Sequence, residues 1–241
     1  MLAPKTAILA DSNEELVNVY SAVKDDVDAL VRHLKQHARS HGRDHYYTMR
    51  DKDLSRLSET GRAARFIYLN KTCFNGLYRV NRRGRFNVPM GRYQDPPILD
   101  EPNLRAASAA LQRVTVKRCD FEETLSYAKP DDFIYLDPPY HPISDTAYFT
   151  AYTKGAFGAS DQEKLAHVFR ELHRRGCRLM LSNSETALTL SLYRDADFRI
   201  ERVSARRNIN SRADRRGRIP EIVVINYEPK AASEPESSVA L

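Results

Sequence analysis

The sequence predicts an α/β fold built around an open sheet, and three observations support this class. Short apolar runs typical of strands alternate along the 241 residues with longer amphipathic segments typical of helices. One such run, 133–136, ends at an acid followed by two prolines, and another, 6–10, ends at Asp11. Strand ends of this kind are where ligands bind in open α/β sheets. A composition of 41% hydrophobic and 29% charged residues is compatible with a soluble globular protein.

The chain opens with a strand over 6–10, followed by a helix that Ser12 or Asn13 can cap. One face of this helix is apolar with a 3.6-residue period and consists of Leu16, Tyr20, Val23, Val27, Leu30, Val31 and Leu34. Asp11 has two readings. An acid at this position of a nucleotide-binding sheet commonly accepts ribose hydroxyls, and an N-cap explains the same residue equally well.

The later part of the chain continues to alternate between expected strands and expected helices. The segment 141–160 is expected to be a mobile loop over a site. The tail over 230–241 is small and polar, which predicts disorder. Helices are expected within 40–70 and over 103–112, 121–126, 161–175 and 186–193, and strands over 114–116, 133–136, 178–181, 198–203 and 221–227.

The segment organising the chain is the apolar run 133–136 and the sequence Asp137-Pro138-Pro139-Tyr140 after it. The run predicts a short buried strand. The prolines donate no backbone N–H and hold their predecessors extended, which makes a rigid corner with one carboxylate and free carbonyls. Asp137 and the Pro138 carbonyl could accept both N–H groups of an exocyclic amine, while Tyr140 stacks on its ring. The plainer alternative is a Pro-Pro turn with an exposed acid.

The stretch 70–93 interleaves aromatic, amide, glycine and arginine residues, with a hairpin turn expected at 83–84. Such residues can contact base edges or wedge into a base step. The alternative is a structural hairpin with a charged tip. Arginines concentrate here and in a second loop-like cluster, which indicates phosphate contacts or two solvated loops. The two groups are Arg79, Arg82, Arg83, Arg85 and Arg92, and Arg206, Arg207, Arg212, Arg215, Arg216 and Arg218.

Composition also indicates which further classes of protein the chain resembles least. No apolar run is long enough for a membrane span, and no signal peptide is visible. Cys73, Cys119 and Cys177 are widely spaced, as in a reduced cytoplasmic protein. His41 and His45 are four residues apart without a nearby cysteine, so no metal site is expected. The formal net charge of +6 is by itself only a weak indication of nucleic-acid binding.

Six motifs occur in the order found in one known family: I-L-A-D at 8–11, N-G-L-Y-R-V-N at 75–81, F-N-V-P-M-G-R-Y at 86–93, D-P-P-Y at 137–140, F-T-A-Y at 149–152 and S-N-S-E-T at 182–186. From about Lys5 to Tyr227 the chain resembles the Dam-type DNA adenine-N6 methyltransferases. The resemblance implies a Rossmann-like methyltransferase sheet over 1–38 and 112–229. It also implies an inserted, mainly helical target-recognition domain over 39–111.

The resemblance implies transfer of a methyl group from S-adenosylmethionine to the N6 amine of a flipped adenine in double-stranded DNA, with GATC as the first target to test. Asp137, Pro138, Pro139 and Tyr140 would form the catalytic corner, and Asp11 and Asp137 would contact the cofactor. The DNA-binding residues would be Phe74 at an intercalating position, together with Asn75, Leu77, Arg79, Pro89, Arg92 and Arg207. A cognate restriction endonuclease is a candidate partner.

The chain departs from the family at its start. The family begins with about forty further residues that contain K-W-x-G-G-K and a strand ending in F-x-G-x-G, and no G-x-G occurs among the nine glycines here. That strand lies centrally in the family sheet, so its absence should split the sheet and leave open edges. The hypothesis is an N-terminally shortened enzyme. Two alternatives remain: a DNA-binding fragment without catalysis, and methylation of an amine on RNA or on a protein glutamine.

Overall fold

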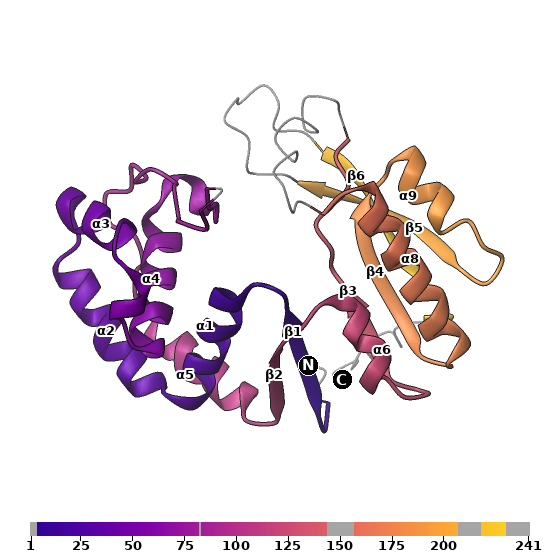
Figure 1. Cartoon of the computed structure of the whole chain (residues 1–241), viewed down its shortest axis with the longest axis horizontal. Coiled ribbons are helices and arrows are strands. Elements are labelled where there is room, and N and C mark those ends of the chain that lie inside the picture. Colours follow the sequence, from indigo (N-terminus) through magenta and orange to yellow (C-terminus); the bar gives the residue numbers. More distant parts are fainter. Residues whose placement is uncertain (1–3, 82, 144–156, 207–217, 230–241) are drawn as a thin grey trace, which may run out of the picture. The chain divides into compact units, whose positions relative to one another are not determined.

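The computed structural model describes residues 4–81, 83–143, 157–206 and 218–229 (Figure 1). The chain divides into two compact units, Met1–Glu123 and Thr124–Leu241. Both units combine helices with strands, which confirms the α/β class. None of the described helices has the length and apolar character that crossing a membrane requires. The predicted disordered tail at 230–241 lies outside the described residues.

In the described part of the first unit, five α-helices pack beside a two-stranded parallel sheet (Figure 1). Strands β1 and β2 pair in a register that places Ala7 opposite Val114 and Asp11 opposite Arg118. Helix α4 contacts α1, α2 and α3. The elements are β1 (Ala7–Asp11), α1 (Glu14–Asp25), α2 (Val27–Arg39), α3 (Arg43–Arg50), η1 (Leu54–Arg56), α4 (Glu59–Thr72), η2 (Phe74–Gly76), α5 (Glu101–Leu111), β2 (Val114–Arg118) and η3 (Phe121–Glu123).

The single helix expected after β1 is wrong, because the structure divides it at Asp26. The backbone of Asp26 leaves the helical region, with φ −146° and ψ 48°, and its amide closes α1 on Ala22. The Asp26 carboxylate accepts a hydrogen bond from the Thr60 hydroxyl at 3.1 Å. The break lets both helices keep their apolar residues on α4. Tyr20, placed on the apolar face by periodicity, is 41% exposed.

Buried aromatic rings form the centre of the first unit. Tyr46 of α3 and Tyr68 of α4 are fully buried together with Leu30 and Leu34 of α2. Burial of two tyrosines requires partners for their hydroxyls. The Tyr46 hydroxyl donates to the carbonyl of Val88 at 3.0 Å, which fixes the segment after α4 onto the helices.

The described residues of the second unit form a four-stranded mixed sheet with helices α8 and α9 beside it (Figure 1). The strand order is β3-β4-β6-β5, with β3 parallel to β4 and the other neighbours antiparallel. Phe169 of α8 packs with Tyr193 and Phe198, and all three are buried. The elements are α6 (Thr124–Tyr127), β3 (Phe133–Leu136), α8 (Ala159–Arg174), β4 (Arg178–Ser184), α9 (Ala187–Leu192), β5 (Arg199–Arg206) and β6 (Arg218–Ile225).

The described strands form two sheets, as the sequence predicted, with two strands in one and four in the other. The prediction that 133–136 is a fully buried strand is wrong. Phe133 and Tyr135 are 58% and 53% exposed, whereas Leu136 is buried. The reason is that β3 is the edge strand of its sheet and hydrogen-bonds only β4 among the described strands. Alternate side chains then meet either the core or solvent.

Candidate functional site

The corner after β3 presents Asp137 to solvent and half-buries Pro138 and Tyr140. Leu136, the last residue of β3, pairs with Leu181 of β4, so the corner lies beside the residues that follow Leu181. The Ser182 hydroxyl donates to Asp137 Oδ1 at 2.6 Å. One carboxylate oxygen is therefore held by the sheet, and the carboxyl group stays accessible.

The backbone of the corner is held by two buried amide side chains. Gln162 of α8 donates through Nε2 to the Pro139 carbonyl at 3.0 Å, and Asn183 Oδ1 accepts the backbone N–H of His141 at 3.0 Å. Asn183 Nδ2 also donates to Gln162 Oε1 at 3.0 Å. Neither amide side chain is exposed to solvent. Because removing any partner would leave a buried polar group unpaired, the network fixes the corner.

The carbonyls of the two prolines differ in availability. The Pro139 carbonyl is occupied by Gln162, whereas no described residue donates to the Pro138 carbonyl. The corner thus keeps one backbone acceptor and one carboxylate for an incoming donor. Burial raises the pKa of Tyr140, so its ring carries a neutral phenol at physiological pH.

Asp11 lies at the end of β1 in the first unit. Asn13, and not Asp11, is the N-cap of α1, since its side chain accepts the amides of Glu15 and Leu16 at 3.1 and 3.4 Å. Asp11 Oδ1 accepts the Asn13 amide at 2.7 Å. The N-cap reading of Asp11 is therefore wrong, and its exposed carboxylate remains able to accept further donors.

The segment 74–93 forms the predicted hairpin. Isolated antiparallel bridges join Val80 to Phe86 and Cys73 to Met90. At the tip, Asn81 Oδ1 accepts the amides of Arg83 and Arg85 at 2.9 and 3.1 Å. Gly84 has φ +72°, a left-handed conformation that favours glycine.

Four of the predicted DNA-binding residues lie on the two arms of this hairpin near its base. Phe74 is 42% exposed, and its amide donates to the Pro89 carbonyl at 2.9 Å. Asn75 has φ +54°, which an asparagine tolerates and which exposes its side chain. Leu77 is half-buried. The fold therefore brings Phe74 and Pro89, fifteen positions apart in the sequence, next to each other.

The predicted arginines differ in how the structure holds them. Arg79 donates through Nε to Asn87 Oδ1 at 2.8 Å, and the Asn87 amide donates to the Arg79 carbonyl at 3.1 Å. Arg92 is exposed beyond the Met90 bridge. Arg207 and the arginines at 212–216 lie outside the described residues, as does the F-T-A-Y motif at 149–152.

A family model described as D12 class N6 adenine-specific DNA methyltransferase matches residues 1–209. The chain belongs to this family. An adenine-specific DNA methyltransferase is an enzyme that acts on DNA.

Relatives agree with the family assignment over almost the whole chain. A type II methyltransferase from Lactococcus lactis subsp. cremoris, M1.LlaDCHI, is 40% identical over 94% of this chain and 81% of its own length. Another from Methanocaldococcus jannaschii, M.MjaIII, is 42% identical over 92% and 81%. A DNA adenine methylase from Serratia marcescens is 35% identical over 90% and 81%.

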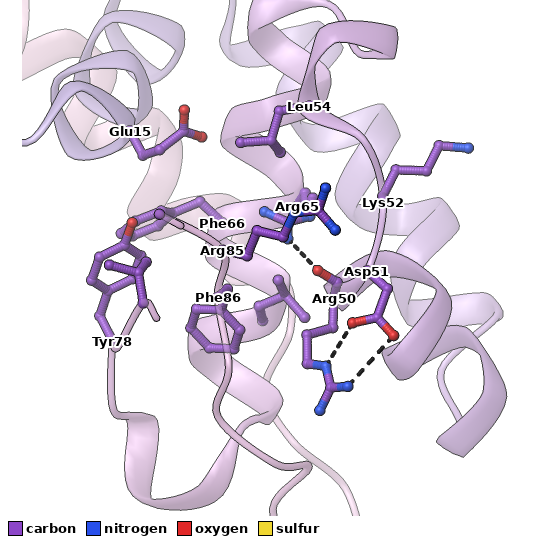
Figure 2. A pocket seen from close by; sticks show the side chains of 13 residues that line it. Glu15, Arg50, Asp51, Lys52, Leu54, Arg65, Phe66, Tyr78, Arg85 and Phe86 are labelled. Carbon is purple, nitrogen blue, oxygen red and sulfur yellow. Dashed lines mark hydrogen bonds and ion pairs between the residues drawn. The ribbon is translucent and has the colours of Figure 1, made fainter. Parts of the chain in front are cut away.

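The methyltransferase has a pocket of about 120 Å³ behind the hairpin, between α3, α4 and the hairpin arms (Figure 2). Phe66 and Tyr78 meet in its wall at 4.8 Å between ring centroids. Buried Arg65 donates to the carbonyl of Arg50 at 2.7 Å, and burial lowers its pKa. The pocket is lined by Glu15, Arg50, Asp51, Lys52, Leu54, Arg65, Phe66, Leu69, Tyr78, Val80, Gly84, Arg85 and Phe86. Charges of both signs line it, so it indicates no single ligand class.

Sequence reasoning assigned no role to Ser182, Asn183, Gln162 or Asn87. One signal was available: Gln162 lies on the apolar face of α8, and Asn183 extends the apolar run of β4. Polar residues at core positions indicate a buried hydrogen-bonded network. In the described part of the chain, no group of His, Cys, Asp and Glu side chains is arranged to hold a metal ion.

Proposed function

We propose that this methyltransferase transfers a methyl group from S-adenosylmethionine to N6 of an adenine flipped out of duplex DNA, with GATC as its target. The observation that supports this proposal most is that the corner leaves two hydrogen-bond acceptors available to a substrate. Asp137 is accessible and held by Ser182, and the Pro138 carbonyl receives no hydrogen bond from the described residues. An amine with two N–H groups matches this pair of acceptors.

The corner would act by changing the electron distribution of the amine. The lone pair of an aromatic amine is delocalised into the ring, which makes it a poor nucleophile. Hydrogen bonds from both N–H groups to Asp137 and to the Pro138 carbonyl favour tetrahedral nitrogen and return the lone pair to it. Tyr140 would stack on the extruded base and hold the nitrogen in position.

The hairpin would recognise the duplex around the flipped base. Phe74 is placed to insert between base steps, while Asn75, Leu77, Arg79 and Pro89 would meet base edges. Arg92 and Arg207 would contact DNA as well, with phosphates as the main acceptors of arginine. The proposal retains 39–111 as the target-recognition domain and 1–38 with 112–229 as the methyltransferase domain.

S-adenosylmethionine would supply an electrophilic methyl group. The residues of this chain fit part of that cofactor, because the exposed carboxylate of Asp11 ends a parallel strand and can accept ribose hydroxyls. Asp137 is the second predicted contact. No glycine pair of the form G-x-G is present to let the backbone approach the cofactor.

The test is a methyl-transfer assay on the purified 241-residue chain with labelled S-adenosylmethionine and a GATC duplex. We expect label on adenine with the wild type. We expect none with Asp137→Ala, which should bind DNA nearly as well because its side chain acts on the amine. A duplex without GATC serves as the control for the target sequence. Parallel loss of transfer and DNA binding in Asp137→Ala would contradict the catalytic role.

Two further outcomes of this assay have a defined meaning. DNA binding without cofactor binding or transfer would support the alternative of a catalytically incompetent DNA-binding protein. If the chain instead labels RNA or a protein glutamine when either is supplied in place of the duplex, that molecule would be the substrate. We also propose a cognate restriction endonuclease as partner, because two relatives carry the name type II methyltransferase.

A further inference from the structure

We propose that Ser182 is the positioning residue of the active site, because its buried hydroxyl joins Asp137 to the hydroxyl of Tyr135 and so holds the carboxylate in one arrangement. This inference rests on the proposed function, in which Asp137 accepts the amine and Tyr140 stacks on the base. It concerns a residue that contacts neither the amine nor the base itself.

The sheet places Ser182 where it can reach both side chains. Ser182 follows Leu181, the partner of Leu136 in the parallel β3–β4 register, so it lies beside Asp137. It is 6% exposed. Successive side chains of a strand point to opposite faces, and Asn183 bonds Gln162 on the face covered by α8. The Ser182 hydroxyl is therefore directed to the face that carries Tyr135.

Counting protons fixes the direction of each hydrogen bond. A serine hydroxyl donates one proton and accepts two. The proton of Ser182 goes to Asp137 Oδ1 at 2.6 Å, since an ionised carboxylate only accepts. Tyr135, whose hydroxyl lies 3.0 Å from Ser182 Oγ, must then donate to it.

The hydroxyl thus gives one bond, to Asp137, and receives one, from Tyr135. Holding Asp137 Oδ1 leaves Oδ2 as the oxygen that meets the substrate amine. The carboxylate is then oriented before substrate arrives, and orientation of reacting groups is a large part of catalysis.

Ser182→Ala should therefore lower kcat by about 10- to 100-fold, with little change in the Kd for DNA. Ser182→Thr keeps the hydroxyl and should restore most of the rate. Ser184→Ala is the matched control, because Ser184 is a buried serine on the same strand whose hydroxyl has no partner in the described part of the chain. We expect wild-type kcat for this control.

Several results would overturn the proposal: equal kcat for Ser182→Ala and wild type, an equal loss in Ser184→Ala, or a threonine variant as slow as the alanine variant. A wild-type chain without transfer would instead count against the proposed function. The positioning role then has an independent readout, the χ1 rotamer distribution of Asp137 from three-bond couplings measured by NMR. Ser182→Ala should average these couplings over several rotamers, and unchanged couplings would overturn the proposal.

Discussion

Arg79 is the proposed DNA-binding arginine that the structure holds on the hairpin by side-chain hydrogen bonds. Its guanidinium donates to Asn87 across the hairpin, through Nε at 2.8 Å and through Nη2 at 3.4 Å, and the residue is exposed. A guanidinium held in this way can donate bidentate hydrogen bonds to O6 and N7 of guanine. The Asn87 contact therefore favours base readout over a flexible contact with phosphate.

We predict that Arg79→Ala weakens binding to the target duplex by about 1–3 kcal/mol and relaxes preference at one base pair. The measurement is DNA affinity by fluorescence anisotropy against duplexes substituted at each position of the site. Arg113→Ala, which removes an exposed arginine between α5 and β2, is the control of equal charge. A loss of the same size on every duplex would make Arg79 a phosphate contact.

At the scale of the elements, α2, α3 and α4 meet at a cluster of His37, His45 and Tyr68. The sequence indicated this cluster only through the four-residue spacing of His41 and His45. His37 of α2 stacks on Tyr68 of α4 at 4.8 Å between ring centroids, and its Nδ1 lies 3.0 Å from Nε2 of His45. Burial, followed by repulsion from His45 and His33, lowers the pKa of His37 to about 4. The rings therefore pack as neutral groups.

This cluster should make the fold acid-sensitive. His37 binds a proton near pH 6.5 when unfolded but only near pH 4 when folded, so stability is intact above pH 6.5 and falls as the pH is lowered towards 4. The full shift corresponds to about 3 kcal/mol, reduced to about 1–2 kcal/mol by solvent screening at a partly exposed ring. Urea unfolding from pH 7.5 to 4 should show this loss, and His37→Phe should flatten it.

The control for that experiment is His167→Gln, because His167 is an exposed histidine on α8. It should leave the pH dependence unchanged. The same acid slope in His37→Phe and wild type would rule out the cluster as its origin.

Sequence reasoning succeeded where one local pattern determines the structure. The helices, the hairpin turn at Gly84 and the strand ending at Asp137 follow from periodicity and turn chemistry. It failed where contacts between residues far apart in the sequence determine the structure. The helix break at Asp26 depends on Thr60, and the exposure of Tyr135 depends on the place of β3 at a sheet edge. The buried network around Gln162 joins residues from separate elements, which no local pattern reveals.

At the scale of the whole molecule, charge is the property that matters for a DNA substrate. The chain has a formal net charge of +6 and a sequence pI of about 9.2. Phosphate contacts release counterions, so affinity for duplex DNA falls steeply with salt. The hairpin over 74–93 alone contributes Arg79, Arg83, Arg85 and Arg92 as exposed cations.

We predict that the Kd for duplex DNA rises by about 100-fold between about 50 mM and about 200 mM salt, as about four phosphate contacts would require. Anisotropy titrations at several salt concentrations measure the slope of log Kd against log salt. Asp137→Ala should give the same slope, because its carboxylate contacts no phosphate. A Kd that does not depend on salt would exclude phosphate contacts as the source of affinity.

Two buried thiols make the opening of each unit separately observable. Cys73 lies at the base of the hairpin in the first unit, and Cys177 precedes β4 in the second. Burial raises the pKa of both thiols, so little thiolate is present or accessible in the folded state at neutral pH. Alkylation must then wait for local unfolding. The labelling rate of Cys73 reports how often the hairpin detaches from α4, and that of Cys177 reports how often the second sheet opens.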